Sequence, residues 1–405
     1  MASLKDLDVT GKKVLVRVDY NVPLTEDKKI SDDTRIARAA PTIQHLLENG
    51  AAVILMSHLG RPQKDKTADG QVDTNKYSLE PLVPTIEDYV GCQVLFVEDT
   101  VGEAARKAAG ELEPGQVLLL ENTRFYSGEE KGDDDLALSL SQLADVYVND
   151  AFGAAHREHA STATVAGHFP ADRKAFGFLM ESEVEGAQKL LNDPGRPATA
   201  IVGGAKVSDK ILLLEKLLNF ADNIIIGGAM AYTFSLAQGG QVGKSLVEKD
   251  KTQHALDFLE KAERARTRVH LPVDTVVGKE FSNATPSKIV PAGQIEDEWE
   301  GLDIGPESVK LFSDVITQSK TILWNGPMGV FEMSNFAKGT NAIAEAVAKA
   351  TKENGAYSLI GGGDSVSAIN QAGLADEVSF VSTGGGAMLE LLEGKELPGI
   401  KAIQN

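Results

Sequence analysis

The sequence predicts an α/β protein with two doubly wound, parallel-sheet domains of the Rossmann-like type, joined by a hinge helix. Two series of short apolar strands indicate this fold, and a Pro/Gly-rich segment separates them. The first series comprises residues 14–18, 51–55, 94–97, 117–120 and 146–148, and the second comprises 199–202, 223–226, 321–324, 357–360 and 378–381. Runs of this length that are apolar on both faces, with helical stretches between them, are typical of parallel strands covered by helices.

The domain boundaries follow from the segment between the two series. Residues 180–191 are expected to be helical, and they run into Asn192-Asp193-Pro194-Gly195-Arg196-Pro197. Such a cluster of turn residues is typical of a domain boundary. We therefore predict a first domain over 1–180, an interdomain helix and hinge over 181–197, and a second domain over 198–390. Within the first domain, Ser31 is expected to cap a helix that ends near Gly50.

Composition and charge exclude several classes of protein. The chain has 405 residues, a formal net charge of −19 and one cysteine, Cys92. A strongly acidic chain disfavours a nucleic-acid partner. No apolar run is long enough to span a membrane, and the first residues lack an apolar signal region. A single cysteine fits a reducing compartment, so a cytoplasmic location is expected.

Polar and cationic side chains follow four strands of the first series. They are Asp19 and Asn21, His58 and Arg61, Arg124, and His156 and Arg157, with Arg35 in the first turns of a following helix. Taken singly, each could be a surface ion pair, a turn residue or a structural histidine. Three of these strand ends deliver cations, and with Arg35 they favour a small ligand with several anionic groups in this acidic chain, because guanidinium forks bind phosphate or carboxylate.

The second series carries glycine turns instead of arginines. Glycines 203–204, 227–228, 361–363 and 384–386 each follow a strand, and Lys206 and Lys210 are expected on one face of the helix after the first of these turns. Glycine turns that open helices expose backbone N–H groups to phosphate oxygens. With Asp364 in one turn, the pattern favours a nucleotide triphosphate with Mg²⁺. Glu332 could accept hydrogen bonds from ribose hydroxyls or be a solvated loop acid.

Eight ordered motifs resemble the phosphoglycerate kinase family over essentially the whole chain. They are RVDYNVP, MSHLGRP, ENTRF, DAFGAAHR, GGAKVSDK, WNGPMGVFE, GGGDS and STGGGA. The resemblance implies a first domain that binds 3-phosphoglycerate or 1,3-bisphosphoglycerate, a second that binds Mg²⁺ with ATP or ADP, and a monomer. It also implies that the C-terminal tail, residues 391–405, packs back on the first domain.

Site residues are carried over from the family position by position. The phosphoglycerate site is expected to comprise Asp19, Asn21, Arg35, His58, Leu59, Gly60, Arg61, Arg124, His156 and Arg157. The nucleotide site is expected to comprise Lys206, Lys210, Asn325, Pro327, Glu332, Gly361, Gly362, Gly363, Asp364 and Ser365, with Asp364 as the metal ligand.

The expected reaction moves a phosphoryl group between an acyl phosphate and ADP. Its nucleophile in the reverse direction is a carboxylate, which is ionised at neutral pH, so no general base is required. Arg35 and Lys206 are expected to contact the transferring group, and the turns at Gly362 and Gly385 to donate backbone N–H bonds. A hinge motion is expected to bring the two ligands together.

Two other functions stay open from the residues alone. An NAD-dependent dehydrogenase would also have two Rossmann-like domains, although no turn matches G-x-G-x-x-G. A non-enzymatic two-domain anion-binding protein would also close around a hinge, although it has no use for a lysine-bearing glycine turn.

Overall fold

The structure is a computed structural model that describes residues 3–405. The chain divides into two compact units. The first unit comprises the chain up to Glu185 together with Glu396–Asn405, and the second comprises Gly186–Lys395. The finer division predicted from the sequence, with a separate hinge at 181–197, stays a prediction.

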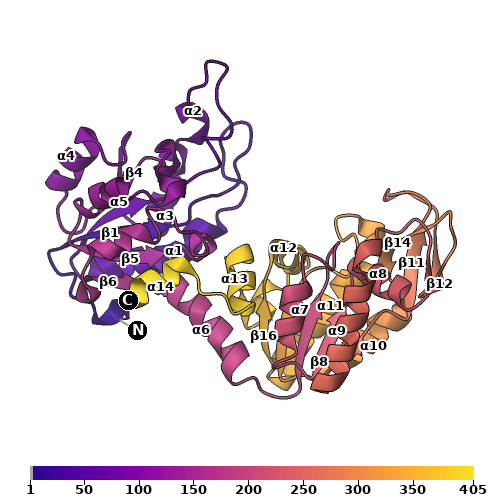
Figure 1. Cartoon of the computed structure of the whole chain (residues 1–405). Helices are drawn as coiled ribbons and strands as arrows, with labels where there is room; N and C mark the ends of the chain where they lie inside the picture. The colour runs from indigo at the N-terminus through magenta and orange to yellow at the C-terminus, as the bar shows by residue number, and fades with distance from the viewer. Residues whose placement is uncertain (1–2) are drawn as a thin grey trace. The chain divides into compact units, whose positions relative to one another are not determined.

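The first unit is built on a six-stranded parallel sheet with the order β3-β4-β2-β1-β5-β6. Its strands are β1 (Lys13–Val18), β2 (Ala52–Met56), β3 (Val94–Val97), β4 (Val117–Leu120), β5 (Val146–Asp150) and β6 (Lys174–Phe176). Its helices are α1 (Thr34–Glu48), α2 (Thr74–Tyr77), α3 (Val83–Val90), α4 (Glu103–Glu111), α5 (Asp134–Ser141) and α14 (Pro398–Gln404), and α6 (Phe178–Asn192) runs from this unit into the second (Figure 1).

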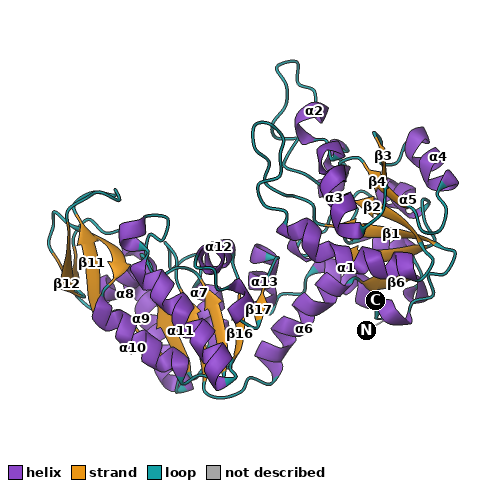
Figure 2. Cartoon of the chain, turned by 180° about the vertical axis from the view of Figure 1, so that it is seen from behind, coloured by secondary structure: helices purple, strands orange, loops and turns teal. Residues whose placement is uncertain are grey.

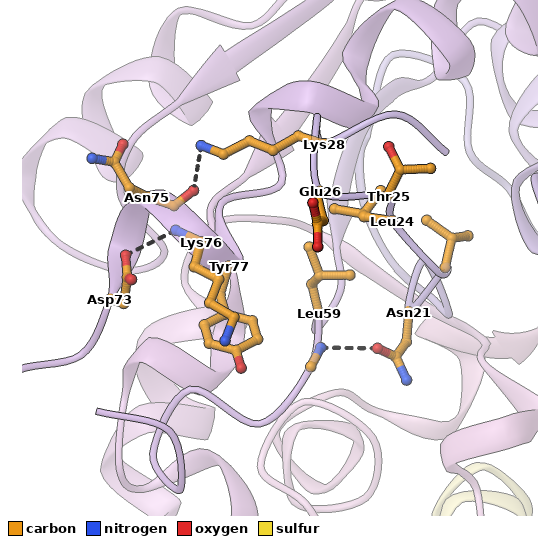
Figure 3. A pocket seen from close by; sticks show the side chains of 12 residues that line it. Asn21, Leu24, Thr25, Glu26, Lys28, Leu59, Asp73, Asn75, Lys76 and Tyr77 are labelled. Carbon is orange, nitrogen blue, oxygen red and sulfur yellow. Dashed lines mark hydrogen bonds between the residues drawn. The ribbon is translucent and has the colours of Figure 1, made fainter. Parts of the chain in front are cut away.

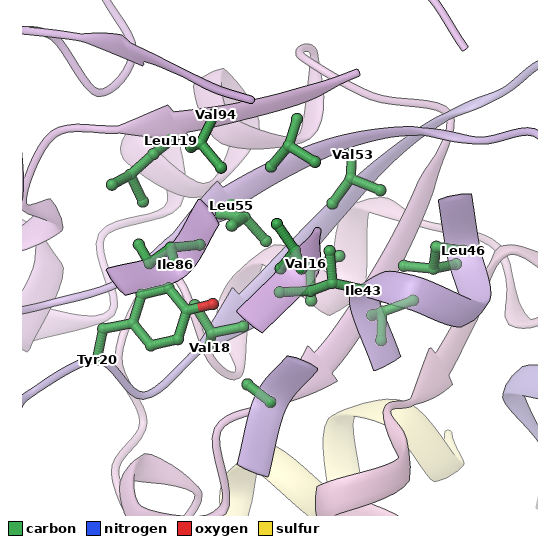
Figure 4. Packing of buried hydrophobic residues seen from close by; sticks show 14 of the residues in the cluster. Val16, Val18, Tyr20, Ile43, Leu46, Val53, Leu55, Ile86, Val94 and Leu119 are labelled. Carbon is green, nitrogen blue, oxygen red and sulfur yellow. The ribbon is translucent and has the colours of Figure 1, made fainter. Parts of the chain in front are cut away.

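Alternation along the strands sorts side chains between the two faces of this sheet. Val16 and Val18 of β1 pack with Ile43 of α1 and Ile86 of α3 in one buried cluster (Figure 4). Arg17 lies between them in sequence, so its side chain points to the other face, where it is fully buried. This arginine is therefore part of the interior and not of the surface.

The C-terminal helix α14 packs on the first unit. The amide of Gly399 donates to the carbonyl of Ala155 at 2.9 Å, and Asn149 Nδ2 donates to the carbonyl of Gly399 at 3.3 Å. Residues 396–405 thus contact the segment that carries the predicted His156 and Arg157.

The second unit is built on another six-stranded parallel sheet, with the order β10-β8-β7-β15-β16-β17. Its strands are β7 (Ala198–Val202), β8 (Asn223–Ile226), β10 (Arg268–His270), β15 (Thr321–Asn325), β16 (Tyr357–Ile360) and β17 (Phe380–Val381). Its helices are α7 (Ile211–Leu217), α8 (Met230–Ala237), α9 (Thr252–Ala265), α10 (Pro306–Thr317), α11 (Lys338–Asn354), α12 (Gly363–Gln371) and α13 (Gly385–Leu392) (Figure 2). The predicted fold class is confirmed, because both sheets are parallel and flanked by helices.

Small additional sheets of the second unit were not predicted. An antiparallel sheet comprises β11 (Asp274–Gly278), β12 (Ser287–Pro291) and β14 (Glu300–Ile304), and β9 (Gln241–Val242) pairs in parallel with β13 (Gln294–Ile295). In β12 exposed residues alternate with half-buried ones, so its sequence lacks the continuous apolar run by which the other strands were found.

The predicted cap at Ser31 is wrong. Helix α1 begins at Thr34, and Asp33 occupies its N-cap position without a side-chain cap hydrogen bond. The exposed Ser31 instead donates its hydroxyl to the carbonyl of Pro23 at 3.2 Å, which closes the preceding loop. Within residues 3–405, the structure contains no helix with the length and apolar character needed to cross a membrane.

Candidate active site

Four neighbouring strands of the first unit deliver the predicted anion-binding residues. Strands β4, β2, β1 and β5 are adjacent and parallel, so their carboxyl ends lie at one edge of the sheet. Arg124 follows β4, His58 follows β2, Asp19 follows β1 and Arg157 follows β5. The topology therefore brings to one edge residues that are up to about 140 positions apart.

Short hydrogen bonds join several of these residues directly. Asp19 Oδ2 accepts from Arg35 Nη1 at 2.9 Å, and Arg35 keeps 36% of its side chain exposed. The amide of Gly60 donates to Asn21 Oδ1 at 2.9 Å, and Arg124 Nη1 donates to the carbonyl of Gly60 at 2.6 Å. Arg35 and Arg124 are thus oriented by the protein before any ligand binds.

Arg17 is a site residue that the sequence interpretation missed. Its Nη2 lies 3.0 Å from His58 Nδ1, and its Nε donates to the Ser161 hydroxyl at 2.7 Å. Ser161 in turn donates its hydroxyl to the buried carboxylate of Glu129, which also accepts from the Ser161 amide at 3.0 Å. The signal was a charged residue inside the apolar strand Val14-Leu15-Val16-Arg17-Val18, because a buried cation needs a compensating anion and hydrogen bonds.

Asn122 is a second missed residue, and it ties three loops together. It is fully buried. Its Oδ1 accepts from the amides of Leu59 (3.3 Å) and Arg124 (3.0 Å), and its Nδ2 donates to the carbonyls of Leu59 (2.8 Å) and Tyr77 (2.9 Å). Every hydrogen-bonding position of this amide is used. Asn122 therefore fixes the loop that carries His58, Gly60 and Arg61 relative to Arg124.

Burial and the concentration of positive charge lower the pKa values of two histidines, His58 and His159. Burial and the nearby charges of Arg17, Arg124 and Arg35 hold the pKa of His58 well below its usual range. A neutral His58 that accepts the Arg17 hydrogen bond at Nδ1 carries its proton on Nε2, where it can serve as a donor.

The remaining cations belong to the same cluster. Burial, followed by repulsion from Arg124, Arg17, Arg157 and His156, lowers the pKa of His159 to about 3. His156 and Arg157 are in hydrogen-bond contact at 2.9 Å. Arg61 is exposed, and its charge acts on Arg124.

A cavity of about 570 Å³ lies beside this cluster (Figure 3). Asn21, Leu59 and Gly60 form part of its wall, and the rest comes from the loop at residues 22–28 and from residues 73–77. Two of these wall residues are hydrogen-bonded to each other, since the Gly60 amide donates to Asn21 Oδ1; this bond is the dashed line beside Asn21 in Figure 3. The ring of Tyr77 lies so close to Gly60 that a Cβ there would be 2.3 Å from Tyr77 Cε1, so this position requires glycine.

In the second unit, two helix N-termini meet at one edge of the sheet. Strands β16 and β17 are parallel neighbours, and α12 and α13 follow them, opening at Gly363 and Gly385. A Cβ on Gly385 would lie 4.0 Å from the Gly363 amide nitrogen, so the two helix starts are close together. Free N–H groups and aligned helix dipoles make this edge suited to phosphate oxygens.

Asn325 connects this edge to a lysine. Lys210 Nζ donates to Asn325 Oδ1 at 2.5 Å, and the buried Asn325 Nδ2 donates to the carbonyl of Gly361 at 2.7 Å. The Gly326 amide donates to the hydroxyl of Ser365, and the buried Pro327 follows. Burial lowers the pKa of Lys210, although the charge of Asp364 opposes this. The structure thus brings together Lys210, Asn325, Gly361 and Ser365.

One local expectation is wrong, namely that Lys206 and Lys210 share a helix face. Helix α7 begins only at Ile211, and Lys210 has the non-helical angles φ −120° and ψ −9°. Gly204 adopts φ +126°, which carries the chain through a loop and not into a helical turn. Lys206 is exposed, and no residue of the described chain pairs with its ammonium group.

Two carboxylates predicted for the nucleotide site are exposed. Asp364 is exposed in the first turn of α12, and Glu332 is exposed after β15. No group of three or more metal-ligating side chains occurs among residues 3–405. A single carboxylate beside glycine turns that suit phosphate fits Mg²⁺, because this ion takes one or two protein carboxylates and otherwise phosphate oxygens and water.

Comparisons with known proteins agree with this arrangement. A family model described as phosphoglycerate kinase matches residues 4–395. The chain is 50% identical over 403 residues to a protein named phosphoglycerate kinase 3, cytosolic, from Arabidopsis thaliana, covering 100% of this chain and 98% of the relative.

Solved structures give the same result. The phosphoglycerate kinase of Coxiella burnetii has a TM-score of 0.88 and 40% identity, and that of Pyrococcus horikoshii OT3 has a TM-score of 0.83 and 32% identity. Each comparison covers 100% of this chain and 98% of the other.

Proposed function

Because the chain belongs to the phosphoglycerate kinase family, we propose that its first unit binds the phosphoglycerate ligand and its second unit binds the nucleotide. The enzyme is a phosphotransferase that moves a phosphoryl group reversibly between 1,3-bisphosphoglycerate and ADP, a step of glycolysis. The dehydrogenase and the non-enzymatic binding protein are not favoured.

The arginine cluster of the first unit supports its assignment as the phosphoglycerate site. A triose ligand with a phosphate and a carboxylate needs several forked donors, which Arg35, Arg61, Arg124 and Arg157 supply. Neutral His58 adds a donor for an oxygen of the ligand. Asp19 and Asn21 hold Arg35 and Gly60 in place.

The adjacent N-termini of α12 and α13 support the assignment of the nucleotide site to the second unit. Backbone N–H groups at Gly362–Gly363 and at Gly385 would hold phosphate oxygens, and Lys210, fixed by Asn325, would neutralise them. Asp364 would hold Mg²⁺, which supplies charge neutralisation for the phosphates. Glu332 would accept from the ribose hydroxyls at the rim.

The chain's own residues then provide orientation and electrostatic stabilisation. The acceptor carboxylate of 3-phosphoglycerate is ionised, so no side chain removes a proton from it. Arg35 and Lys206 would donate to the oxygens of the transferring group, where negative charge spreads during transfer. The freedom of the exposed Lys206 fits a group that forms its contact only with both ligands present.

The two ligands have to meet for in-line transfer, so a hinge motion in the interdomain helix would accompany the reaction. Small-angle scattering with and without both ligands tests this, and an unchanged radius of gyration would contradict it. The relative from Arabidopsis thaliana is named cytosolic, which supports a cytosolic location. The monomeric state is tested by analytical ultracentrifugation.

The assignment of ligands to units is tested by calorimetric titration of matched variants. Arg61→Gln should weaken 3-phosphoglycerate binding at least tenfold and leave ADP binding unchanged, because it removes one forked donor to that ligand. Arg61 is exposed, so the variant should fold normally. Lys210→Gln should weaken ADP binding and leave 3-phosphoglycerate binding unchanged. Arg38→Gln, an exposed arginine outside the cluster, is the control. A reversed pattern would exchange the two sites.

A further inference from the structure

A second concentration of arginines lies in the second unit, away from its glycine turns. Four of the chain's twelve arginines belong to this unit, and three of them line a cavity of about 480 Å³. The lining residues are Arg196, Pro197, Asp222, Asn223, Arg266 and Arg268, which we call the arginine pocket.

The topology explains why these residues meet. Arg196 and Pro197 precede β7, Asp222 and Asn223 lie at the start of β8, and Arg268 begins β10. Strands β7, β8 and β10 are adjacent and parallel, so the arginine pocket lies at their amino ends. The phosphate-binding turns follow the carboxyl ends of the strands of the same sheet. The arginine pocket is therefore separate from the nucleotide site.

The charges in the arginine pocket are not balanced. Among the residues that line the pocket, Asp222 is the one carboxylate. It forms an ion pair with Arg196 and accepts a hydrogen bond from the amide of Ala198 at 2.7 Å. No residue of the described chain forms an ion pair or a side-chain hydrogen bond with Arg266 or Arg268. In a chain of net charge −19, two such guanidinium groups facing one cavity are unusual.

The side-chain amide of Asn223 adds an uncharged hydrogen-bond donor to the arginine pocket. His270 Nε2 lies 3.0 Å from Asn223 Oδ1, so the amide oxygen of Asn223 has a partner and its Nδ2 group is available as a donor. Two forked cations and an amide donor match the tetrahedral oxygens of phosphate, and the cavity has room for more than one phosphoryl group.

We propose that the arginine pocket binds a small anion with phosphate groups, of the pyrophosphate or phosphate-ester class, independently of the nucleotide and phosphoglycerate sites. Arg266 and Arg268 are its principal ligands, and Arg196 contributes from the segment that follows α6. The bound anion supplies the negative charge that the pocket lacks.

The test is a titration of the full-length enzyme, with ¹⁵N-labelled arginine, by inorganic pyrophosphate, observed through the arginine Nε–Hε signals. The signals of Arg266, Arg268 and Arg196 should shift and saturate together. In the double variant R266Q/R268Q, the Arg196 signal should respond with an affinity reduced about tenfold or more. Both substitutions are on exposed residues, so kinase activity and unfolding temperature should not change.

Two controls make the experiment decisive. Arg264→Gln removes a neighbouring exposed arginine that pairs with Glu260 at 3.2 Å and does not line the pocket, so it should leave the titration unchanged. Succinate should bind more weakly than pyrophosphate. The proposal is overturned if the Arg266 and Arg268 signals drift without saturating, if they follow the Arg264 signal, or if succinate binds equally well.

Discussion

Replacing Gly362 with alanine is expected to damage the nucleotide site through one identifiable contact. Gly362 adopts φ +91°, and a Cβ at this position would lie 2.5 Å from Asn325 Nδ2. Asn325 is fully buried, so it cannot move away without losing its bonds to Gly361 and Lys210. The substitution therefore disturbs the residue that links the helix start to the lysine.

The magnitude follows from these two effects. Backbone strain at a positive φ costs about 1–2 kcal/mol for a residue with a Cβ. Displacing Asn325 leaves buried polar groups without partners, which adds about 1–3 kcal/mol. A total of about 3 kcal/mol lowers the unfolding temperature of a unit of this size by roughly 6–12 °C. Loss of the orientation of Lys210 should raise the KM for ATP by about tenfold to a hundredfold.

Alanine substitutions at two other glycines distinguish the effect of backbone strain from the effect of the contact with Asn325. Gly355 has a similar positive φ of +64° with open space around it, so Gly355→Ala should lower stability by about 1 kcal/mol and leave the KM for ATP unchanged. A Cβ on Gly363 would meet no atom within 4 Å, so Gly363→Ala should fold normally and raise the KM for ATP by obstructing the phosphate. Steady-state kinetics and thermal unfolding of the three variants measure both effects. If Gly355→Ala weakened ATP binding as much as Gly362→Ala, the role given to Asn325 would be refuted.

Three further predictions concern other parts of the molecule. Lys206→Ala should lower kcat by roughly a hundredfold or more with little change in stability or KM, because this exposed lysine has no partner in the described chain; a change in KM alone would contradict the role in transfer. Asn122→Ala should lower stability by about 2–4 kcal/mol and raise the KM for 3-phosphoglycerate but not for ATP, measured by urea unfolding and kinetics, since four hydrogen bonds to three loops are lost. Burial raises the pKa of Asp150 to about 6, above the roughly 3.9 of an unfolded chain, so the folded state keeps the proton longer and loses stability as pH rises from about 4 to 6. Asp150→Asn should therefore reduce this loss, and equal pH profiles for the two proteins by chemical unfolding would disprove the explanation.

Five of the six strands in each main sheet could be found from sequence, because most of them are continuous apolar runs, whereas β6 and β10 were not predicted. Strands β3, β4, β8 and β16 begin and end where predicted. The short antiparallel sheet was missed because β12 alternates exposed and half-buried residues, and its pairing with β11 depends on chain segments brought together only in the folded unit. Sequence periodicity does not contain that information.

The site was predicted unevenly for a similar reason. Arg124 could be proposed from sequence because it follows a strand in an acidic chain and belongs to the motif ENTRF, whereas Arg35 lies in a helix outside the eight motifs and was carried over from the family by position. The helix start after Gly204 could not be found, because the spacing of Lys206 and Lys210 fits both a helix face and a loop. Arg17 and Asn122 act through hydrogen bonds with Ser161 and Tyr77, and these bonds join segments far apart in the chain.

Acidic partners explain how the first unit keeps so many cations together before a ligand arrives. Arg17 is compensated through Ser161 by Glu129, Arg35 by Asp19, and Arg124 by Glu130 at 3.5 Å. His58 stays neutral because burial, and then the nearby charges of the arginines, lower its pKa. This compensation is incomplete, since repulsion from the arginines still contributes to the lowered pKa of His159. An anion that enters the cluster relieves this repulsion as well as accepting hydrogen bonds, so the fold converts electrostatic repulsion among fixed cations into affinity for a multiply charged ligand.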